Sequence, residues 1–308
     1  MRVLSGSPVD WHPGDERRAV AIGVFDGVHR GHQAVLSAMV EAATGAGLVA
    51  AVLTFDPHPR SVVAPQRAPR LLTTVGQRVG LLGDLGVEVV AVAPFDDRVR
   101  LLAPEAFATE LLVDGLGAVS VTVGSDFRFG NDRTGDAGTL EQLGESLGFA
   151  VSVVSLVGGD EPVSSSQIRR LVADGEVTAA ADALGRPHEV VGRVVPGDGR
   201  GRGIGVPTAN IDLPPMLAVP GRGVYAVTAS TDGLEWLPGV ANIGVRPTFG
   251  GDAERLEVHL LDTDLDLYGR ELRVRFIARI REERTFDGVE LLVAQIRDDV
   301  EAARSLLA

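Results

Sequence analysis

The stretch AIGVFDGVHRGHQAVL, residues 21–36, decides the fold expected for the first half of the chain. It is apolar up to Phe25, places one aspartate, two glycines and two histidines within residues 26–32, and then becomes amphipathic. An apolar run, a glycine-rich turn and an amphipathic segment in this order predict a buried strand followed by a helix. Because a helix N-terminus presents unpaired N–H groups and about half a positive charge, this turn is a candidate anion site.

Further apolar runs alternate with helical patterns throughout residues 1–186. The runs are AVAIGVF (19–25), LVAAVLTF (48–55), VEVVAVAPF (87–95), AVSVTVG (118–124) and FAVSVVSLV (149–157). Helices are expected from His32 to the GAG at 45–47 and over 74–85, 104–114, 138–147 and 165–173. Continuous apolar runs are typical of strands buried on both faces of a parallel sheet. The pattern therefore predicts an open, doubly wound α/β domain with ligands outside the carboxyl ends of its strands.

The pattern changes near Arg186 and Pro187. Between residues 190 and 280 the apolar runs are short and alternating, with Gly and Pro between them, which predicts antiparallel strands and a small barrel. An apolar stripe over residues 288–307 predicts a final helix packed on this barrel. We therefore expect two domains, residues 1–186 and 187–308.

Charge and composition exclude several classes of function. The net charge of −13 is the wrong sign for a protein that binds nucleic acid through phosphate contacts. The chain has no cysteine, and all 29 of its basic residues are arginines, which excludes thiol chemistry, Schiff bases and a lysine-containing phosphate loop. Neither a signal peptide nor an apolar run of ~20 residues is found, so we expect a cytoplasmic protein without a membrane partner.

The pair His29 and His32 is the first catalytic candidate. Glycines at 27 and 31 let the backbone approach a ligand, and the imidazoles can donate to phosphate oxygens as pyrophosphate leaves an attacked α-phosphate. Two surface histidines in a flexible turn are the alternative reading. The co-occurrence of strand, glycines, Asp26, histidines and helix in this order favours the catalytic one.

Several motifs together resemble a known family. GVFDGVHRGHQ (23–33) resembles the His-x-Gly-His motif of adenylyltransferases, and TFDPHP (54–59), LLTT (71–74), GSDFRFG (124–130) and VSSSQIRR (163–170) follow in order. The chain resembles the bacterial bifunctional riboflavin kinase/FAD synthetases over nearly its whole length. This resemblance implies a Rossmann-like nucleotidyltransferase domain followed by a riboflavin kinase barrel.

The resemblance also implies roles for residues of the first domain. It implies that His29 and His32 contact the ATP phosphates and the transition state. It also places the following residues at the ATP phosphates: Gly23, Phe25, Asp26, Gly31, Asp126, Ser165, Ser166 and Arg169. Asp126 would also approach Mg²⁺. The implied flavin contacts are Phe55, Pro57, His58, Phe127 and Phe129. The family usually has Thr at position 166, and Asn in some members at 126.

The second candidate site begins at GDGRGRGIGVPTAN, residues 197–210. Its glycines make a tightly turning or mobile loop in which Arg200 and Arg202 supply positive charge, and Thr208 and Asn210 offer the hard oxygen ligands that Mg²⁺ accepts. A flexible solvated turn is the alternative. The resemblance makes this a kinase site, with ATP held by Gly199, Arg200, Gly201, Arg202, Gly203, Thr208 and Asn210.

Glu257 is the candidate base of the kinase site. In the strand LEVHL, Glu257 and His259 point away from the side of Leu256, Val258 and Leu260. A carboxylate of this kind is usually only solvated. The resemblance assigns it the role of general base on the ribityl 5′-hydroxyl. Val206 stands where the family usually has Phe, which predicts looser packing beneath the metal-binding turn.

The sequence thus predicts a two-step flavin-cofactor enzyme. The second domain would phosphorylate riboflavin to FMN, and the first would join AMP from ATP to FMN, giving FAD and pyrophosphate, with Mg²⁺ as cofactor. The expected partners are small molecules. We also expect copies of the chain to associate as a homo-oligomer. Two alternatives are an adenylyltransferase whose β domain only binds flavin, and a non-catalytic flavin or nucleotide sensor.

Overall fold

The computed structural model describes residues 1–155, 163–197, 206–231, 234–248, 251–263 and 265–308. Side chains are described for these residues except within 245–254. The chain forms two compact units, the first made of Met1–Pro69 and Thr74–Ser165, the second of Arg70–Thr73 and Ser166–Ala308. The expected domain boundary between Arg186 and Pro187 stays a prediction. The two units are distinguished by the contacts among their residues, and these contacts do not show where one domain ends along the chain.

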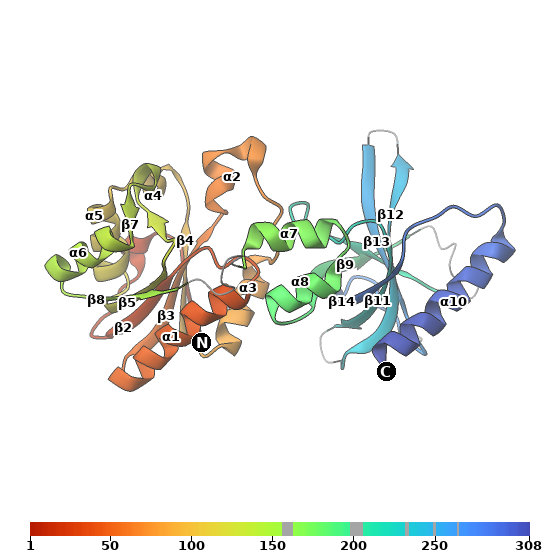
Figure 1. Ribbon diagram of the computed structural model, residues 1–308, viewed down its shortest axis with the longest axis horizontal. Helices are drawn as coiled ribbons and strands as arrows, with labels where there is room; N and C mark the ends of the chain where they lie inside the picture. Colours follow the sequence, from red (N-terminus) through yellow and green to blue (C-terminus); the bar gives the residue numbers. More distant parts are fainter. Residues whose placement is uncertain (156–162, 198–205, 232–233, 249–250, 264) are drawn as a thin grey trace. The chain divides into compact units, whose positions relative to one another are not determined.

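The first unit contains a parallel six-stranded sheet in the order β1-β4-β3-β2-β5-β8 (Figure 1). The strands are β1 (Arg2–Ser5), β2 (Arg18–Ile22), β3 (Val49–Asp56), β4 (Val89–Pro94), β5 (Ala118–Gly124) and β8 (Ala150–Val154). A short hairpin pairs β6 (Arg128–Phe129) with β7 (Gly135–Asp136). All five residues of β2 are buried, as the continuous apolar run predicts for a central strand.

Helices cover both faces of this sheet. They are α1 (Arg30–Ala46), α2 (Pro59–Val63), α3 (Val75–Asp84), α4 (Asp97–Arg100), α5 (Pro104–Phe107), a π-helical segment (Ala108–Asp114) and α6 (Ala137–Leu147). Ala19 and Ala21 of β2 pack in a core with α1 and α3, while Val20 and Ile22 pack in a second core with α5 and α6. Alternate residues of one strand therefore serve two cores, which makes the sheet doubly wound.

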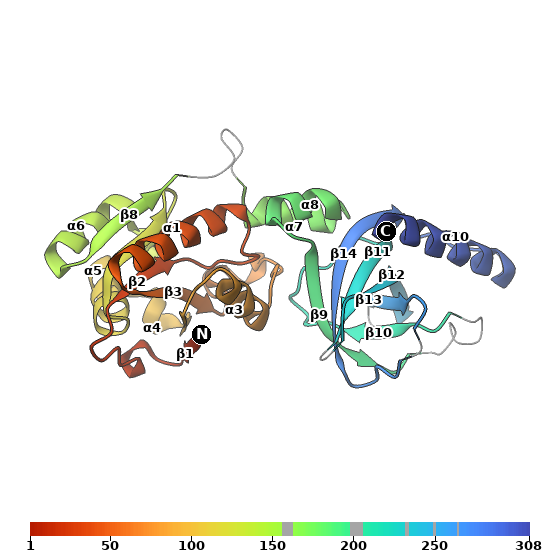
Figure 2. The same ribbon diagram turned by 90° about the horizontal axis from the view of Figure 1, so that it is seen from below.

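The second unit is a closed antiparallel barrel in the order β10-β13-β12-β11-β14-β9 (Figure 2). Its strands are β9 (His188–Val195), β10 (Ala209–Asp212), β11 (Gly223–Ser230), β12 (Leu237–Thr248), β13 (Gly251–Leu260) and β14 (Glu271–Arg281). Residues alternate between the apolar interior and the outside, as period-2 patterning predicts.

Within the described residues, the helices that belong mainly to the second unit are α7 (Ser165–Ala173), α8 (Val177–Leu184) and α10 (Val289–Leu307). Helix α10 lies along β11, β12 and β14. Arg281 of β14 makes a bidentate ion pair with Asp299 of α10, whose side chain is buried. The expected final helix is thus confirmed, together with its packing on the barrel.

The main differences from the sequence prediction are short elements. The helix expected over 104–114 is divided into an α-helical turn and a π-helical segment, in which the N–H of Gly115 donates to the carbonyl of Glu110. Strand β1 and helices α2, α4 and α8 were not predicted, because each is too short or too evenly apolar to show a clear period. The doubly wound domain and the barrel with its final helix are confirmed.

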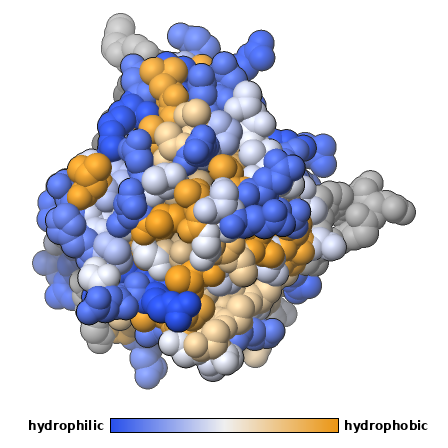
Figure 3. All heavy atoms as spheres, turned by 90° about the vertical axis from the view of Figure 1, so that its left-hand side faces the viewer, coloured by the Kyte–Doolittle hydropathy of each residue, from blue (hydrophilic) through white to orange (hydrophobic). Residues whose placement is uncertain are grey.

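Strand β8 is an edge of the first unit's sheet, and Val153 in it is exposed. Figure 3 faces the side on which α6 and β8 lie in Figure 1 and shows a band of apolar side chains among hydrophilic ones. Among the helices in the described part of the chain, none has the length and apolar character needed to cross a bilayer.

Candidate active sites

The first site lies at the carboxyl end of β2. The chain passes from β2 to β3 and β4 on one side and then crosses to β5 on the other, so the strand order reverses between β2 and β5. Ligands of open α/β sheets bind in the crevice at such a switch point. The residues that follow β2 and β5 are the two motif segments GVFDGVHRGHQ and GSDFRFG. The topology therefore brings together two motifs that are about a hundred residues apart in the sequence.

His29 is the N-cap residue of α1. Its Nδ1 accepts a hydrogen bond from the backbone N–H of His32 at 3.4 Å. An Nδ1 that accepts leaves the proton of a neutral imidazole on Nε2, which makes Nε2 a donor. The two imidazole rings are stacked with their centroids 3.6 Å apart, and the edge of Phe25 contacts His32 with centroids 5.3 Å apart. The predicted pair is therefore held at the start of the helix by capping and stacking.

Glycines make room for these rings. A Cβ on Gly31 would lie 3.1 Å from Cε1 of His29, and a Cβ on Gly23 would lie 3.0 Å from the ring of Phe25. Phe25 itself has a φ of 51°, which non-glycine residues rarely adopt. Both glycines thus permit side chains to fold back closely onto the turn.

Two aspartates flank the turn. Asp26 is buried, and its carbonyl oxygen accepts a hydrogen bond from the hydroxyl of Ser165 at 3.0 Å. Asp126 follows β5 and is exposed, and its Oδ1 lies 3.2 Å from the position of a Cβ on Gly124. The Asp126 carboxylate is therefore folded back over the end of β5, at the switch point.

Three predicted phosphate ligands lie at the start of α7, which begins at Ser165 as expected. Ser165 belongs to the first unit and binds the turn directly. Ser166 and Arg169 belong to the second unit, where the Nε of Arg169 donates to the carbonyl of Arg70 at 2.7 Å. Ser165 therefore contacts the histidine turn through the carbonyl of Asp26.

The predicted flavin residues belong partly to the core. Phe127 and Phe129 are stacked at 5.4 Å and 14°, so they share a face as expected. Phe129 also packs on Phe107, which packs on Phe55, and this series of rings connects the ends of β3 and β5. Phe55 and Phe129 are buried, while Phe127 is half-buried. Phe127 consequently offers the larger accessible ring surface of the stacked pair.

The remaining two predicted flavin residues follow β3. Pro57 is exposed and forms a cis peptide bond with Asp56. His58 is half-buried, and its Nδ1 accepts from the N–H of Arg60 at 3.1 Å, which caps α2. Both residues therefore lie at the carboxyl end of the same sheet.

The second site lies on the outside of the barrel. Glu257 of β13 pairs with Asn210 of β10 on one side and with Asn242 of β12 on the other. Directly paired residues of antiparallel strands point to the same face, with Cβ atoms about 5 Å apart. Leu256 and Val258 point into the core, as predicted. The carboxylate of Glu257 is thus flanked by two side-chain amides on neighbouring strands.

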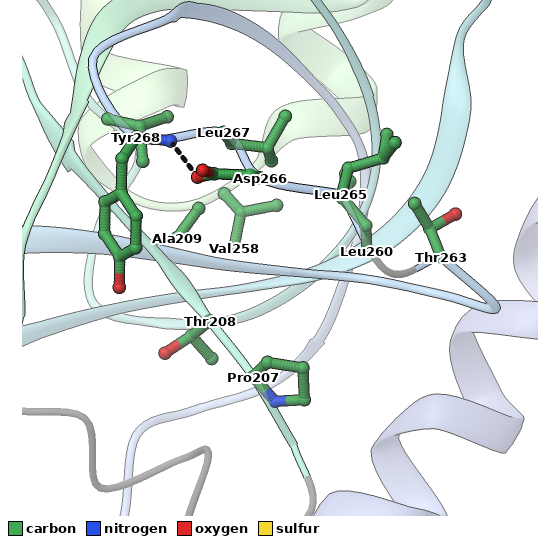
Figure 4. A pocket seen from close by; sticks show the side chains of 11 residues that line it. Pro207, Thr208, Ala209, Val258, Leu260, Thr263, Leu265, Asp266, Leu267 and Tyr268 are labelled. Carbon is green, nitrogen blue, oxygen red and sulfur yellow. Dashed lines mark hydrogen bonds between the residues drawn. The ribbon is translucent and has the colours of Figure 1, made fainter.

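A pocket lies beside Thr208, lined by residues of β9, β10 and β13 and of the segment after β13. Its volume of about 740 Å³ is within the range of small-molecule sites, and it is lined by Val194, Pro207, Thr208, Ala209, Val258, Leu260, Thr263, Leu265, Asp266, Leu267 and Tyr268 (Figure 4). Figure 4 shows Thr208 and Pro207 at one side of the pocket and Tyr268 with Asp266 at another. The ring of His259 is 2.7 Å from the carbonyl of Pro207 through Nδ1, so it donates there and holds the PTAN segment against β13.

Thr208 and Asn210 fit a divalent cation. Asn210 Oδ1 is a buried side-chain oxygen, and no described residue donates a hydrogen bond to it. A buried amide oxygen that accepts no hydrogen bond is a suitable ligand for a hard cation such as Mg²⁺. The described residues include no group of three or more His, Asp or Glu side chains that could hold a metal ion.

The glycine loop of this site, with Gly199, Arg200, Gly201, Arg202 and Gly203, lies outside the described residues. Sequence reasoning assigned no role to Arg78 in the first unit or to Asn242 in the second, and it placed His259 beside Glu257 without predicting its contact with Pro207. Asn242 begins the stretch NIGVRPTF, but its pairing with Glu257 is given only by the strand register. Arg78 is a charged residue within an ordinary helical pattern and gives no sequence signal.

Comparison with known proteins assigns both units. Residues 12–167 match the family model described as FAD synthetase, and residues 184–307 match the model described as riboflavin kinase. A solved structure titled as a macrolide-efflux protein from Streptococcus pneumoniae is 30% identical and has a TM-score of 0.90, with 99% of each chain covered. That title describes the other protein, and both family models that match this chain describe flavin enzymes.

Curated relatives agree with the family models. A bifunctional riboflavin kinase/FMN adenylyltransferase of Pseudomonas fluorescens is 44% identical over 96% of this chain and 94% of its own. One from Escherichia coli K12 is 42% identical over 92% of this chain and 91% of its own. With two matching domains in the same order, the chain belongs to the bifunctional riboflavin kinase/FMN adenylyltransferase family.

Proposed function

We propose that His29 and His32 carry adenylyl transfer to FMN in the first unit and that Glu257 carries phosphorylation of riboflavin in the second. The observation that supports the first assignment best is the stacked histidine pair at the N-terminus of α1, at the switch point of the sheet. The observation that supports the second is the placement of Glu257 between Asn210 and Asn242.

In adenylyl transfer an oxygen of the FMN phosphate attacks the α-phosphorus of ATP, and the bond to the β-phosphate oxygen breaks to release pyrophosphate. Negative charge grows on the α-phosphate and on the leaving group. The Nε2–H of His29, the imidazole of His32 and the first N–H groups of α1 are donors that meet this charge. Asp126, Ser165, Ser166 and Arg169 remain our predicted phosphate contacts.

In the kinase reaction Glu257 accepts the proton of the riboflavin 5′-hydroxyl as that oxygen attacks the γ-phosphorus of a second ATP. Asn242 is paired directly with Glu257 across the strands, so its amide lies on the same face of the barrel as the carboxylate. Most of the rate enhancement in phosphoryl transfer comes from positioning and neutralisation of charge. The pocket beside Thr208 is the predicted place for the nucleotide.

We further propose that Thr208 and Asn210 hold Mg²⁺ together with ATP phosphates. The metal, when bound, neutralises phosphate charge and orients the triphosphate. The unpartnered Oδ1 of Asn210 supports this assignment among the described residues. We keep Asp126 as the metal-proximal residue of the first unit, and we predict a cytoplasmic location because both reactions consume ATP.

A pair of variants tests the two-site assignment. His29→Asn keeps a side chain that can cap α1 but removes the imidazole, so FAD formation from FMN should fall by about 100-fold or more while FMN formation is unchanged. Glu257→Gln should produce the opposite pattern. Flavins separated by chromatography during incubation with riboflavin, ATP and Mg²⁺ give both rates in one experiment. If either variant lowered both rates equally, the two-site assignment would be wrong.

A further inference from the structure

Arg78 of α3 is a buried cation that the proposed mechanism does not use. Its side chain is 1% exposed, whereas arginines are almost never fully buried unless they are paired. It lies in the helix that packs with α1 and the central strands on one face of the sheet. A methionine or leucine would fill such a position at a lower desolvation cost, so a buried arginine here calls for a specific explanation.

The hydrogen bonds of Arg78 lead directly to the first site. Its Nη1 donates to the hydroxyl of Thr54 at 3.0 Å and to the carbonyl of Phe55 at 3.1 Å. Thr54 is itself fully buried and donates to the carbonyl of Val24 at 2.9 Å. Arg78 therefore ties the carboxyl end of β3 to the segment after β2 that leads into the histidine turn.

The charges around Arg78 also connect it with the first site. Burial lowers the pKa of Arg78, while the carboxylates of Asp26 and Asp56 act to raise it. Asp26 lies in the turn after β2 and Asp56 is the last residue of β3, at the carboxyl end of the sheet where we propose that the two anionic substrates bind. A fixed positive charge beneath them offsets their repulsion of phosphate groups.

We propose that Arg78 is a positioning residue for adenylyl transfer, which aligns the histidine turn through Thr54 and Val24 and supplies positive charge beneath the phosphate-binding edge. This inference rests on the proposed role of His29 and His32. It assigns two separable contributions to one side chain: hydrogen bonds that hold the turn in place, and charge that favours anionic substrates.

Three variants separate these contributions. Arg78→Met keeps a side chain of similar volume and removes both the hydrogen bonds and the charge. We therefore expect kcat for FAD formation to fall about 100-fold and KM for ATP and FMN to rise. Arg78→Lys restores the charge and should return KM close to that of the unmodified protein while kcat stays low. Thr54→Val leaves Arg78 in place and removes only the connecting hydroxyl, so kcat should fall several-fold with KM unchanged.

The control is Arg17→Met, which makes the same change in charge at an exposed position beside the amino end of β2. It should leave both activities unchanged. FMN formation by the second unit in the same sample reports the concentration of active protein, and circular dichroism melting reports the fold of each variant.

The outcomes are distinguishable. If Arg78→Met and Thr54→Val leave the kinetics of FAD formation unchanged while His29→Asn abolishes it, the inference about Arg78 is wrong and the proposed function stands. If Arg78→Met does not fold, Thr54→Val decides the matter. A loss of stability in Thr54→Val without the expected fall in kcat would show that Arg78 has a structural role only, and the inference would be wrong. If His29→Asn has no effect, the proposed function fails independently.

Discussion

Replacing Gly31 by alanine should damage FAD synthesis through the position of His29. The added Cβ would lie 3.1 Å from Cε1 and 3.2 Å from Nδ1 of His29, whereas ordinary contacts begin at 3.4 Å. The ring must therefore move by about 0.3 Å, and movement towards His32 is opposed by the stacking of the two imidazoles. If a displacement of 1 Å costs about 100-fold in rate, one of about 0.3 Å costs roughly fourfold, and it should appear in kcat.

The matched control is Gly45→Ala, near the other end of the same helix, where an added Cβ meets nothing within 4 Å. Alanine is favoured over glycine in a helix by up to about 1 kcal/mol, so this variant should melt slightly higher and keep both activities. Initial rates of FAD formation from FMN and of FMN formation from riboflavin are measured for each protein at saturating ATP. Only Gly31→Ala should change a rate, and only that of FAD formation.

An unchanged kcat in Gly31→Ala would refute the argument that the imidazole of His29 is held within tenths of an ångström. An equal loss in Gly45→Ala would show that the effect comes from helix α1 as a whole. A fall in FMN formation in either variant would contradict the assignment of the two reactions to separate units.

Two further predictions concern the second unit. Burial raises the pKa of Glu189, but hydrogen bonds and ion pairs from Arg273 and Arg275 outweigh it and leave the pKa below 4.5. The charge of Glu189 therefore stabilises the fold at pH values above the pKa of the unfolded state. Glu189→Gln should lower the free energy of unfolding by about 2 kcal/mol near pH 7. Thermal melting of variant and parent should show this difference shrinking as the pH falls below 4.5. Asn210→Ala should raise the Mg²⁺ concentration required for half-maximal FMN formation by at least about tenfold, the smallest loss typical when even a residue that supports a metal ligand is replaced. The Mg²⁺ dependence of FAD formation should be unchanged in a titration at fixed ATP, and an equal Mg²⁺ dependence of FMN formation in variant and parent would remove Asn210 from the metal site.

Local patterns predicted the larger elements of the fold because hydrophobic periodicity and turn chemistry agree there. The helix predicted over residues 165–173 has these bounds in the structure, and the GAG at 45–47 ends α1 with Gly47 in the left-handed conformation. The sequence did not predict the π-helical segment or the short helices, since their hydrogen bonding leaves no distinct period. It also could not supply the pairing of Glu257 with both Asn210 and Asn242, because strand register depends on the closed barrel as a whole.

Arg78 illustrates a different limit of sequence reasoning. In the pattern of α3 it lies beside apolar residues and resembles any arginine whose stem covers a helix face with its charge in water. Its burial follows from the meeting of β2, β3 and α3, which are separate in the chain. The resemblance to a family found the histidines, but a residue that acts through Thr54 and not by touching substrate appears only once the contacts are known.

The glycines show how the two kinds of information combine. The chain has 38 of them, so the presence of glycine near a motif carries little weight in itself. At four glycines beside the candidate sites, an added Cβ would meet a predicted site residue: Gly23 against Phe25, Gly31 against His29, Gly124 against Asp126 and Gly197 against Asn210. Helical glycines such as Gly45, Gly76 and Gly80 meet nothing within 4 Å. Because glycines beside a predicted site residue occur in both units, the same reasoning applies to two unrelated folds: the missing Cβ leaves space for a neighbouring predicted site residue, and alanine there should displace that residue.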